Sequence, residues 1–141
     1  MRESRIIVDS GPLVAFLVDS DDFHSWAVEQ FRSLVPPFIT CEAVLTETFH
    51  LFSRLRHGHR RFFELLASDL LVVEFNVIAE RDALGRLVRR YSDLPMSLAD
   101  ACLVRMAELM PGASVFTLDR HFKVYRKHRR QLIPTIMPPG R

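Results

Sequence analysis

The sequence has little cysteine and no long apolar run. Its only two cysteines, Cys41 and Cys102, each lie in an apolar or helical stretch, which is more typical of buried thiols than of a disulfide framework. No apolar run approaches the ~20 residues needed to cross a bilayer. The first residues also lack the apolar region of a signal peptide. The sequence therefore predicts a cytoplasmic protein without a membrane segment.

Lysine is also scarce, although the chain is basic. Of 19 lysine and arginine residues only Lys123 and Lys127 are lysines, and the formal net charge is +2. A charge this small identifies no partner. The planar guanidinium group of arginine suits phosphate, so the arginine bias favours a nucleic-acid partner, although a coding preference for arginine would produce the same bias.

Neither length nor composition indicates a second domain. The 141 residues are 48% hydrophobic, which suffices for one core but falls short of the usual two-domain size. We therefore expect a single domain over residues 1–141. Residues 137–141, which end in Pro-Pro-Gly-Arg, are expected to form a flexible tail.

Short apolar stretches alternate with amphipathic ones along the chain. Strands are expected at residues 5–8, 38–40, 71–75, 114–117 and 132–136, the last at a sheet edge because Pro134 interrupts it. Helices are expected at residues 13–18, 23–34, 41–55, 60–67, 78–91, 97–110 and 119–127. This alternation predicts an α/β fold with a mainly parallel sheet of about five short strands.

Four acidic residues, Asp9, Glu47, Asp100 and Asp119, occupy positions from which they can meet. Asp9 and Asp119 come at or just after the ends of two predicted strands, and the carboxyl ends of parallel strands converge at one edge of a sheet. Asp100 lies in the first turn of a helix, and Glu47 lies on a helix that follows a strand. We therefore expect the four carboxylates to share one cleft.

Carboxylates gathered in one cleft repel one another unless a cation neutralises them or some of them hold protons. Oxygen ligands alone are what Mg²⁺ or Mn²⁺ prefers, whereas zinc sites favour histidine and cysteine. Such an ion stabilises the charge that develops on a phosphodiester and activates a water molecule. The acids therefore favour metal-dependent hydrolysis without a covalent nucleophile.

Each acid also has an ordinary structural explanation. Asp9 and Asp119 could cap the helices that follow them, and Ser97 and Asp100 fit the Ser-x-x-Asp capping-box pattern. Glu47 is harder to explain in this way, because it lies at the edge of the apolar stripe of its helix. Glu42, in the first turn of the same helix, is expected to be structural or to act from outside the site.

Four segments carry a resemblance to a known family. They are residues 6–13 (Ile-Ile-Val-Asp-Ser-Gly-Pro-Leu), 41–47 (Cys-Glu-Ala-Val-Leu-Thr-Glu), 98–101 (Leu-Ala-Asp-Ala) and 115–122 (Val-Phe-Thr-Leu-Asp-Arg-His-Phe). In order and approximate spacing the chain resembles the PIN-domain nucleases, and among them the toxins of VapBC-type toxin–antitoxin pairs. Each motif alone is weak, but four in sequence are fairly specific.

The resemblance implies a three-layer α/β/α fold and a metal-dependent ribonuclease that leaves a 5′-phosphate and a 3′-hydroxyl. It makes Asp9 and Asp100 the central metal ligands, with Asp119 and Glu47 completing the acidic pocket and Thr117 helping to shape it. Many similar chains have an acid where this one has Ser97. This departure favours one metal ion over two.

The resemblance also implies an RNA substrate, a small antitoxin protein and a homodimer, for which helices containing Phe16, Phe23 and Trp26 could form the interface. Two other functions stay open. One is a phosphoryl-accepting signalling domain, which also groups acids at strand ends but needs a nearby lysine, and Lys123 falls within a predicted helix. The other is a PIN-like binding module without catalysis.

Basic residues form a run at 126–130, and Arg54, Arg56, Arg60 and Arg61 form a second group. These side chains could follow an RNA backbone by neutralising its phosphates. For any single arginine, however, a solvated helix face is the more common explanation.

Overall fold

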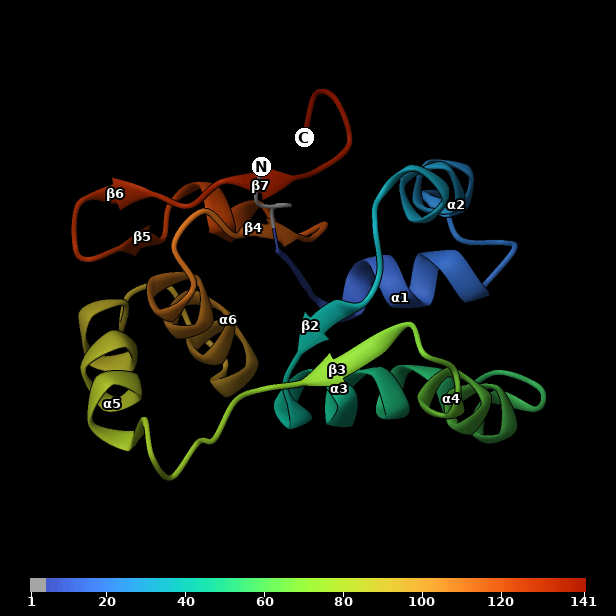
Figure 1. Ribbon diagram of the computed structural model, residues 1–141, viewed down its shortest axis with the longest axis horizontal. Coiled ribbons are helices and arrows are strands. Elements are labelled where there is room, and N and C mark those ends of the chain that lie inside the picture. Colours follow the sequence, from blue (N-terminus) through green and yellow to red (C-terminus); the bar gives the residue numbers. More distant parts are fainter. Residues whose placement is uncertain (1–4) are drawn as a thin grey trace.

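The computed structural model describes residues 5–141 (Figure 1). The elements in chain order are β1 Ile6–Val8, α1 Ser10–Leu17, α2 His24–Ser33, β2 Phe38–Thr40, α3 Glu42–Phe52, α4 Gly58–Ala67, β3 Leu71–Val73, α5 Arg81–Arg90, α6 Leu98–Leu109, β4 Ser114–Phe116, the 3₁₀ helix η1 Arg120–Lys123, β5 Arg126–Lys127, β6 Gln131–Leu132 and β7 Thr135–Ile136.

Five of the strands form one sheet, in the order β3-β2-β1-β4-β7. β1 lies in the centre, where Ile7 is paired with Ile39 of β2 and with Val115 of β4. All neighbouring strands in this sheet are parallel. The predicted α/β fold with about five short parallel strands is therefore confirmed. Because β1 and β4 are neighbours, the residues that follow them start from adjacent positions at the carboxyl edge.

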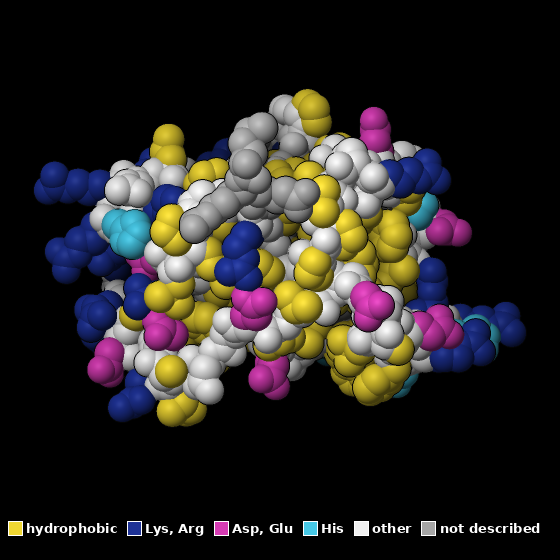
Figure 2. Space-filling model, viewed as in Figure 1, with side chains coloured by type: hydrophobic (Ala, Val, Ile, Leu, Met, Phe, Trp, Pro, Cys, Tyr) yellow, Lys and Arg dark blue, Asp and Glu magenta, His cyan; other side chains and the backbone are white. Residues whose placement is uncertain are grey.

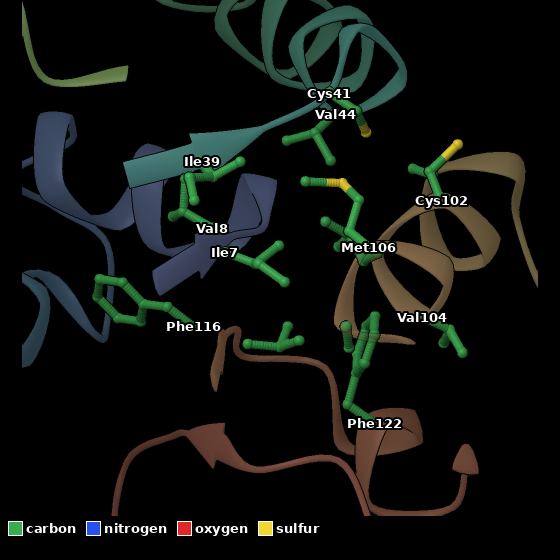
Figure 3. Packing of buried hydrophobic residues seen from close by; sticks show 14 of the residues in the cluster. Ile7, Val8, Ile39, Cys41, Val44, Cys102, Val104, Met106, Phe116 and Phe122 are labelled. Carbon is green, nitrogen blue, oxygen red and sulfur yellow. The ribbon is translucent and has the colours of Figure 1, made fainter. Parts of the chain in front are cut away.

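Helices cover both faces of the sheet (Figure 1). On one face Phe116 of β4 packs against Trp26 and Phe31 of α2, with ring centroids 5.5 and 5.0 Å apart. On the other face Ile7 of β1 points toward Met106 of α6 (Figure 3). α1 lies against α2 and α3, α4 against α3, and α5 against α6. The fold is thus the expected three-layer α/β/α arrangement.

The two cysteines lie in the core between helices and sheet. Cys41, just before α3, and Cys102, in α6, are buried free thiols, as predicted. Figure 3 shows both near Val44 and Met106, at the layer that joins α3 and α6 to the central strands. This packing fixes the start of α3 and the first half of α6, the two helical segments that carry expected site residues.

The helix predicted over residues 119–127 is wrong. The chain instead forms η1 over Arg120–Lys123 and then enters β5. The amide of Tyr125 donates to the carbonyl of His121 (2.9 Å), and both Phe122 and Tyr125 are buried. Apolar residues three apart fit a 3₁₀ turn as well as an α-helix, so the spacing alone could not separate them.

The basic run at residues 126–130 consequently lies on a hairpin formed by β5 and β6. The strand predicted at residues 132–136 is also divided in two: β6 pairs antiparallel with β5, whereas β7 pairs parallel with β4. Pro134 separates them, because it has no N–H to donate, although its carbonyl accepts from the amide of Val115 (2.8 Å). The predicted edge position is confirmed for β7.

Across residues 5–141, none of the helices combines the length and the apolar character that a membrane crossing requires.

Candidate active site

One pocket, of about 440 Å³, is lined by all four acids singled out in the sequence. Asp9 follows β1 and Asp119 follows β4, at the carboxyl edge of the sheet. Glu47 reaches the pocket from α3 and Asp100 from the first turn of α6. Ser97, where similar chains have an acid, is not among the lining residues.

Asp9 is the most buried of the four acids, with 6% of its surface exposed. Its carboxylate accepts hydrogen bonds from the Ser10 amide and from the Thr117 hydroxyl, each at 2.7 Å. Burial raises the pKa of Asp9 to about 7, and repulsion from Asp100 and Glu47 adds to the effect, while the two hydrogen bonds oppose it. A cation bound nearby would therefore stabilise the ionised form of Asp9.

Asp100 is held by a residue far along the chain. The hydroxyl of Tyr125 donates to its carboxylate at 3.0 Å, and the amide of Asp100 donates to the side chain of Ser97, also at 3.0 Å. Burial raises the pKa of Asp100, and Asp119 and Glu47 raise it further. The capping explanation thus holds for Ser97, whereas the Asp100 carboxylate binds Tyr125 and faces the pocket.

Asp119 and Asp9 are connected through Thr117. The Thr117 hydroxyl donates to Asp9 and accepts from the amide of Asp119 at 3.0 Å, and Thr117 itself is fully buried. The Asp119 carboxylate accepts from the amide of His121 at 2.9 Å and lies 3.2 Å from Nδ1 of the same residue. The capping role expected for Asp119 is therefore present, and the same side chain lines the pocket.

Glu47 is the most exposed of the four acids. Its carboxylate accepts a hydrogen bond from the hydroxyl of Ser10, the first residue of α1. Ser10 lies directly after Asp9, so this contact brings α3 to the end of β1. Glu42, in the first turn of α3, is exposed and is not among the pocket-lining residues, in keeping with the lesser role expected for it.

The pocket also contains residues that the sequence did not single out. Tyr125 holds Asp100, and Arg120, His121 and Arg141 line the pocket. The Arg141 guanidinium donates from Nε to the carbonyl of Leu118 at 2.7 Å and lies 4.9 Å from the centre of the Phe23 ring. No local pattern indicates the contacts of Tyr125 and Arg141, because each joins segments far apart in the sequence, whereas Arg120 and His121 directly follow Asp119. The flexibility expected for residues 137–141 stays a prediction.

The donors fit a hard divalent cation in type, since four carboxylates line the pocket and two of them, Asp9 and Asp100, have a raised pKa. Among residues 5–141, however, no group of three or more acidic, histidine or cysteine side chains is already arranged to hold an ion. Each carboxylate instead accepts hydrogen bonds from the protein. The donors are the Ser10 amide and Thr117 for Asp9, Tyr125 for Asp100, the His121 amide for Asp119, and the Ser10 hydroxyl for Glu47.

The fold and the pocket define a class: three-layer α/β proteins with an acidic site at the carboxyl edge of a parallel sheet. The chain belongs to the PIN domain family, whose family model matches residues 6–128. This confirms the family identified from the sequence motifs.

A solved structure shares the fold. The crystal structure of VapC20 of Mycobacterium tuberculosis, described as a toxin that cleaves the sarcin–ricin loop, superposes with a TM-score of 0.74 at 23% sequence identity. The match covers 92% of this chain and 99% of that one. A search of curated proteins found no match.

Proposed function

We propose that the protein is a divalent-metal-dependent endoribonuclease that acts in the cytoplasm as the toxin of a toxin–antitoxin pair. The observation that carries the proposal is the convergence of Asp9, Glu47, Asp100 and Asp119, from four separate elements, on one pocket of about 440 Å³. Membership of the PIN family and the fold shared with an RNA-cleaving toxin support RNA as the substrate.

In this proposal Asp9 and Asp100 hold Mg²⁺ or Mn²⁺, and Asp119 and Glu47 complete the acidic shell. When bound, such an ion stabilises negative charge on a phosphodiester and lowers the pKa of a water molecule that attacks phosphorus. Thr117 positions Asp9 and Asp119 together, and Tyr125 orients Asp100. The products are a 5′-phosphate and a 3′-hydroxyl.

Replacing Asp100 or Asp9 with asparagine should lower Mg²⁺-dependent RNA cleavage by at least about a hundredfold, because it removes a carboxylate that the ion needs. Cleavage of a labelled RNA by the purified variants measures the effect, and circular dichroism checks folding. Glu42→Gln is the matched control, since it removes an exposed acid of α3 that does not line the pocket. Full activity of folded Asp100→Asn protein would overturn the assignment.

The alternatives fit the pocket less well. A phosphoryl-accepting domain needs a lysine at its acids, but Lys123 is exposed on η1 and does not line the pocket, whose cationic groups are Arg120 and Arg141. A non-catalytic module would have no need to keep all four acids. Failure of an acyl-phosphate to label the protein would close the first alternative. Calorimetric titration with Mn²⁺ tests the second, because the nuclease should bind the ion and the Asp9→Asn variant should not.

An apolar groove between α3 and α4 supports an antitoxin partner. A pocket of about 270 Å³ between α3 and α4 is lined by Leu45, Phe49, Phe62 and Leu66. The neighbouring Phe63 is 59% exposed, and hydrophobic side chains gather over this part of the molecule at the lower right of Figure 2. α3 carries both this groove and Glu47. A segment with apolar side chains and one basic side chain would engage both surfaces.

The homodimer also belongs to this proposal. The rings of Phe16 and Trp26, expected at the interface, contact Phe31 and Phe116 within the same chain. Both are only partly buried, so α1 and α2 retain apolar surface for a second copy. Light scattering at high concentration measures the assembly, and a strict monomer would remove this part of the proposal.

A further inference from the structure

A second pocket, of about 260 Å³, lies away from the acids, between α5, α6 and the turn of the β5–β6 hairpin. Four arginines line it: Arg86 and Arg90 of α5, Arg105 of α6 and Arg129 of the turn. Glu108 is its one acidic lining residue. Figure 2 shows lysine and arginine side chains gathered along this edge, at the left of the view. We call this feature the arginine pocket.

Arg105 has a structural role within the arginine pocket. Its Nε lies 2.6 Å from Oε1 of Glu80, and one of its terminal nitrogens lies 3.2 Å from Oε1 of Glu108. The other oxygen of Glu108 accepts a hydrogen bond from the amide of His128 at 2.7 Å. Both acids therefore already have partners. Glu80 pairs with Arg105, and Glu108 pairs with Arg105 and with the amide of the hairpin turn.

The other three arginines keep their charge available. Arg86, Arg90 and Arg129 are exposed and form no ion pair or side-chain hydrogen bond with any residue from 5 to 141. The arginine pocket thus carries a surplus of positive charge on three guanidinium groups. Three cations held this close repel one another, so an anion placed between them is stabilised.

The hairpin turn is built to hold Arg129 over this pocket. His128 and Arg129 both have left-handed backbone, with φ of 49° and 71°, which is uncommon for residues other than glycine. Such a conformation persists only where the surroundings impose it, and here Glu108 binds the His128 amide. α6 therefore fixes the turn, and with it the third cation.

The guanidinium groups that line the pocket favour a phosphate group as the ligand. Guanidinium groups bind phosphate oxygens through pairs of N–H donors, and such charge-assisted hydrogen bonds are among the strongest in proteins. α6 connects this pocket to the acidic one, because Asp100 lies in its first turn and Glu108 near its end. At 1.5 Å per residue the two positions are about 12 Å apart along the helix. A polynucleotide strand spans such a distance easily.

We propose that the arginine pocket binds a backbone phosphate of the RNA substrate, at a position near to but distinct from the bond cleaved in the acidic pocket. The inference rests on the proposed ribonuclease function. Arg86, Arg90 and Arg129 contact the phosphate, whereas Arg105, Glu80 and Glu108 hold the pocket in shape. The subsite contributes to RNA affinity and to the register of cleavage, not to the chemical step.

The test removes the three free cations and measures RNA binding. Arg86→Gln, Arg90→Gln and Arg129→Asn are combined, since asparagine tolerates the left-handed backbone at position 129. In an Asp100→Asn background, which prevents cleavage, affinity for a labelled single-stranded RNA should fall roughly ten- to fiftyfold at about 0.15 M salt. The slope of log K against log salt should decrease in magnitude by about 0.7, the value for one lost phosphate contact on a single strand.

A matched control removes three exposed arginines that do not line this pocket: Arg32→Gln, Arg81→Gln and Arg89→Gln. With Asp100 restored, the arginine-pocket variant should show a raised KM on the same RNA and an unchanged kcat, a split that a folding defect would not produce. Equal affinity in the two triple variants would overturn the inference. So would unchanged RNA binding combined with loss of an acidic protein partner, which would reassign the pocket.

The outcomes also separate this inference from the proposed function. If the parent protein cleaves RNA and the arginine-pocket variant matches it in KM and salt dependence, only the subsite is wrong. If the parent neither binds nor cleaves RNA, the ribonuclease proposal fails and the subsite fails with it.

Discussion

Asp9 caps a helix and lines the acidic pocket with the same carboxylate. One oxygen accepts from the Ser10 amide at the start of α1, and the other accepts from Thr117 after β4. Helix capping and a place in the pocket are therefore compatible. Because the side chain is almost fully buried, its ionisation at neutral pH is costly in the metal-free protein.

This cost predicts how the stability of the metal-free protein depends on pH. Burial raises the pKa of Asp9 from 3.8 to about 7, so between these values the folded chain holds a proton that the unfolded chain releases. The contribution of Asp9 to the free energy of unfolding is thus present below about pH 4 and lost as the pH rises to 7. At about pH 8 the loss is at most about 4 kcal/mol, from 1.36 kcal/mol per pKa unit.

Asp9→Asn should accordingly be more stable than the parent protein at about pH 8 in EDTA, and the difference should vanish near pH 4. Urea unfolding at several pH values measures it. Glu42→Gln serves as control, because it removes an exposed acid outside the pocket. Parallel pH profiles of stability for the parent and the Asp9→Asn variant would show that ionisation of Asp9 does not cause the pH dependence.

Sequence reasoning reached some site residues and missed others for identifiable reasons. Asp9 and Asp119 follow strands that the sequence predicted, and parallel strands bring their ends together whatever the details of packing. Tyr125 and Arg141 had no such signal. Tyr125 meets Asp100 only because η1 folds back onto α6, and Arg141 meets the pocket only because the chain returns after β7. The roles of all these residues stay a proposal.

At the scale of elements, the start of α4 depends on one glycine. His57, directly before it, has left-handed backbone with φ of 61°, and the Gly58 amide donates to the carbonyl of Leu55 at 3.0 Å. A Cβ at Gly58 would lie 1.8 Å from the backbone oxygen of Phe52. The end of α3 and the start of α4 therefore approach too closely for any side chain.

Gly58→Ala should destabilise the protein by more than about 3 kcal/mol, because backbone must move to admit the methyl group. Gly85→Ala in α5 is the matched control. A Cβ there would meet only the tip of the flexible Arg89 side chain, at 3.3 Å, so this variant should be more stable by roughly 0.5–1 kcal/mol. Similar urea midpoints for the two variants would contradict the close approach at α4.

Elements with local signals were predictable, and elements defined by distant partners were not. Helix α6 begins after Ser97, whose side chain accepts from the Asp100 amide, within one residue of the predicted start. The region from 119 to 136 differed, because its conformation follows from contacts made elsewhere. Glu108 fixes the hairpin turn from α6, and β7 exists through its pairing with β4. Neither partner can be identified from the segment's own residues.

For the whole molecule, α3 joins the acidic pocket to the apolar groove against α4. Glu47 lies in the pocket, and Leu45 and Phe49 line the groove. A partner bound in the groove would thus contact the same helix that carries Glu47.

This arrangement predicts that a small antitoxin requires the groove. If the neighbouring reading frame encodes such an antitoxin, Phe63→Ser should strongly reduce its copurification with this protein, since the substitution removes an exposed ring next to the groove. Val35→Ser, which removes a similarly exposed apolar side chain outside the groove, should have no effect. Equal recovery of the partner with both variants would contradict a role for α3 and α4.

The position of Arg141 has a practical consequence for handling the protein. Since Arg141 lines the acidic pocket, anything that follows it in a longer chain, including a purification tag, starts at the rim of that pocket. A polyhistidine tag fused there would bring imidazoles beside the carboxylates and compete for added manganese.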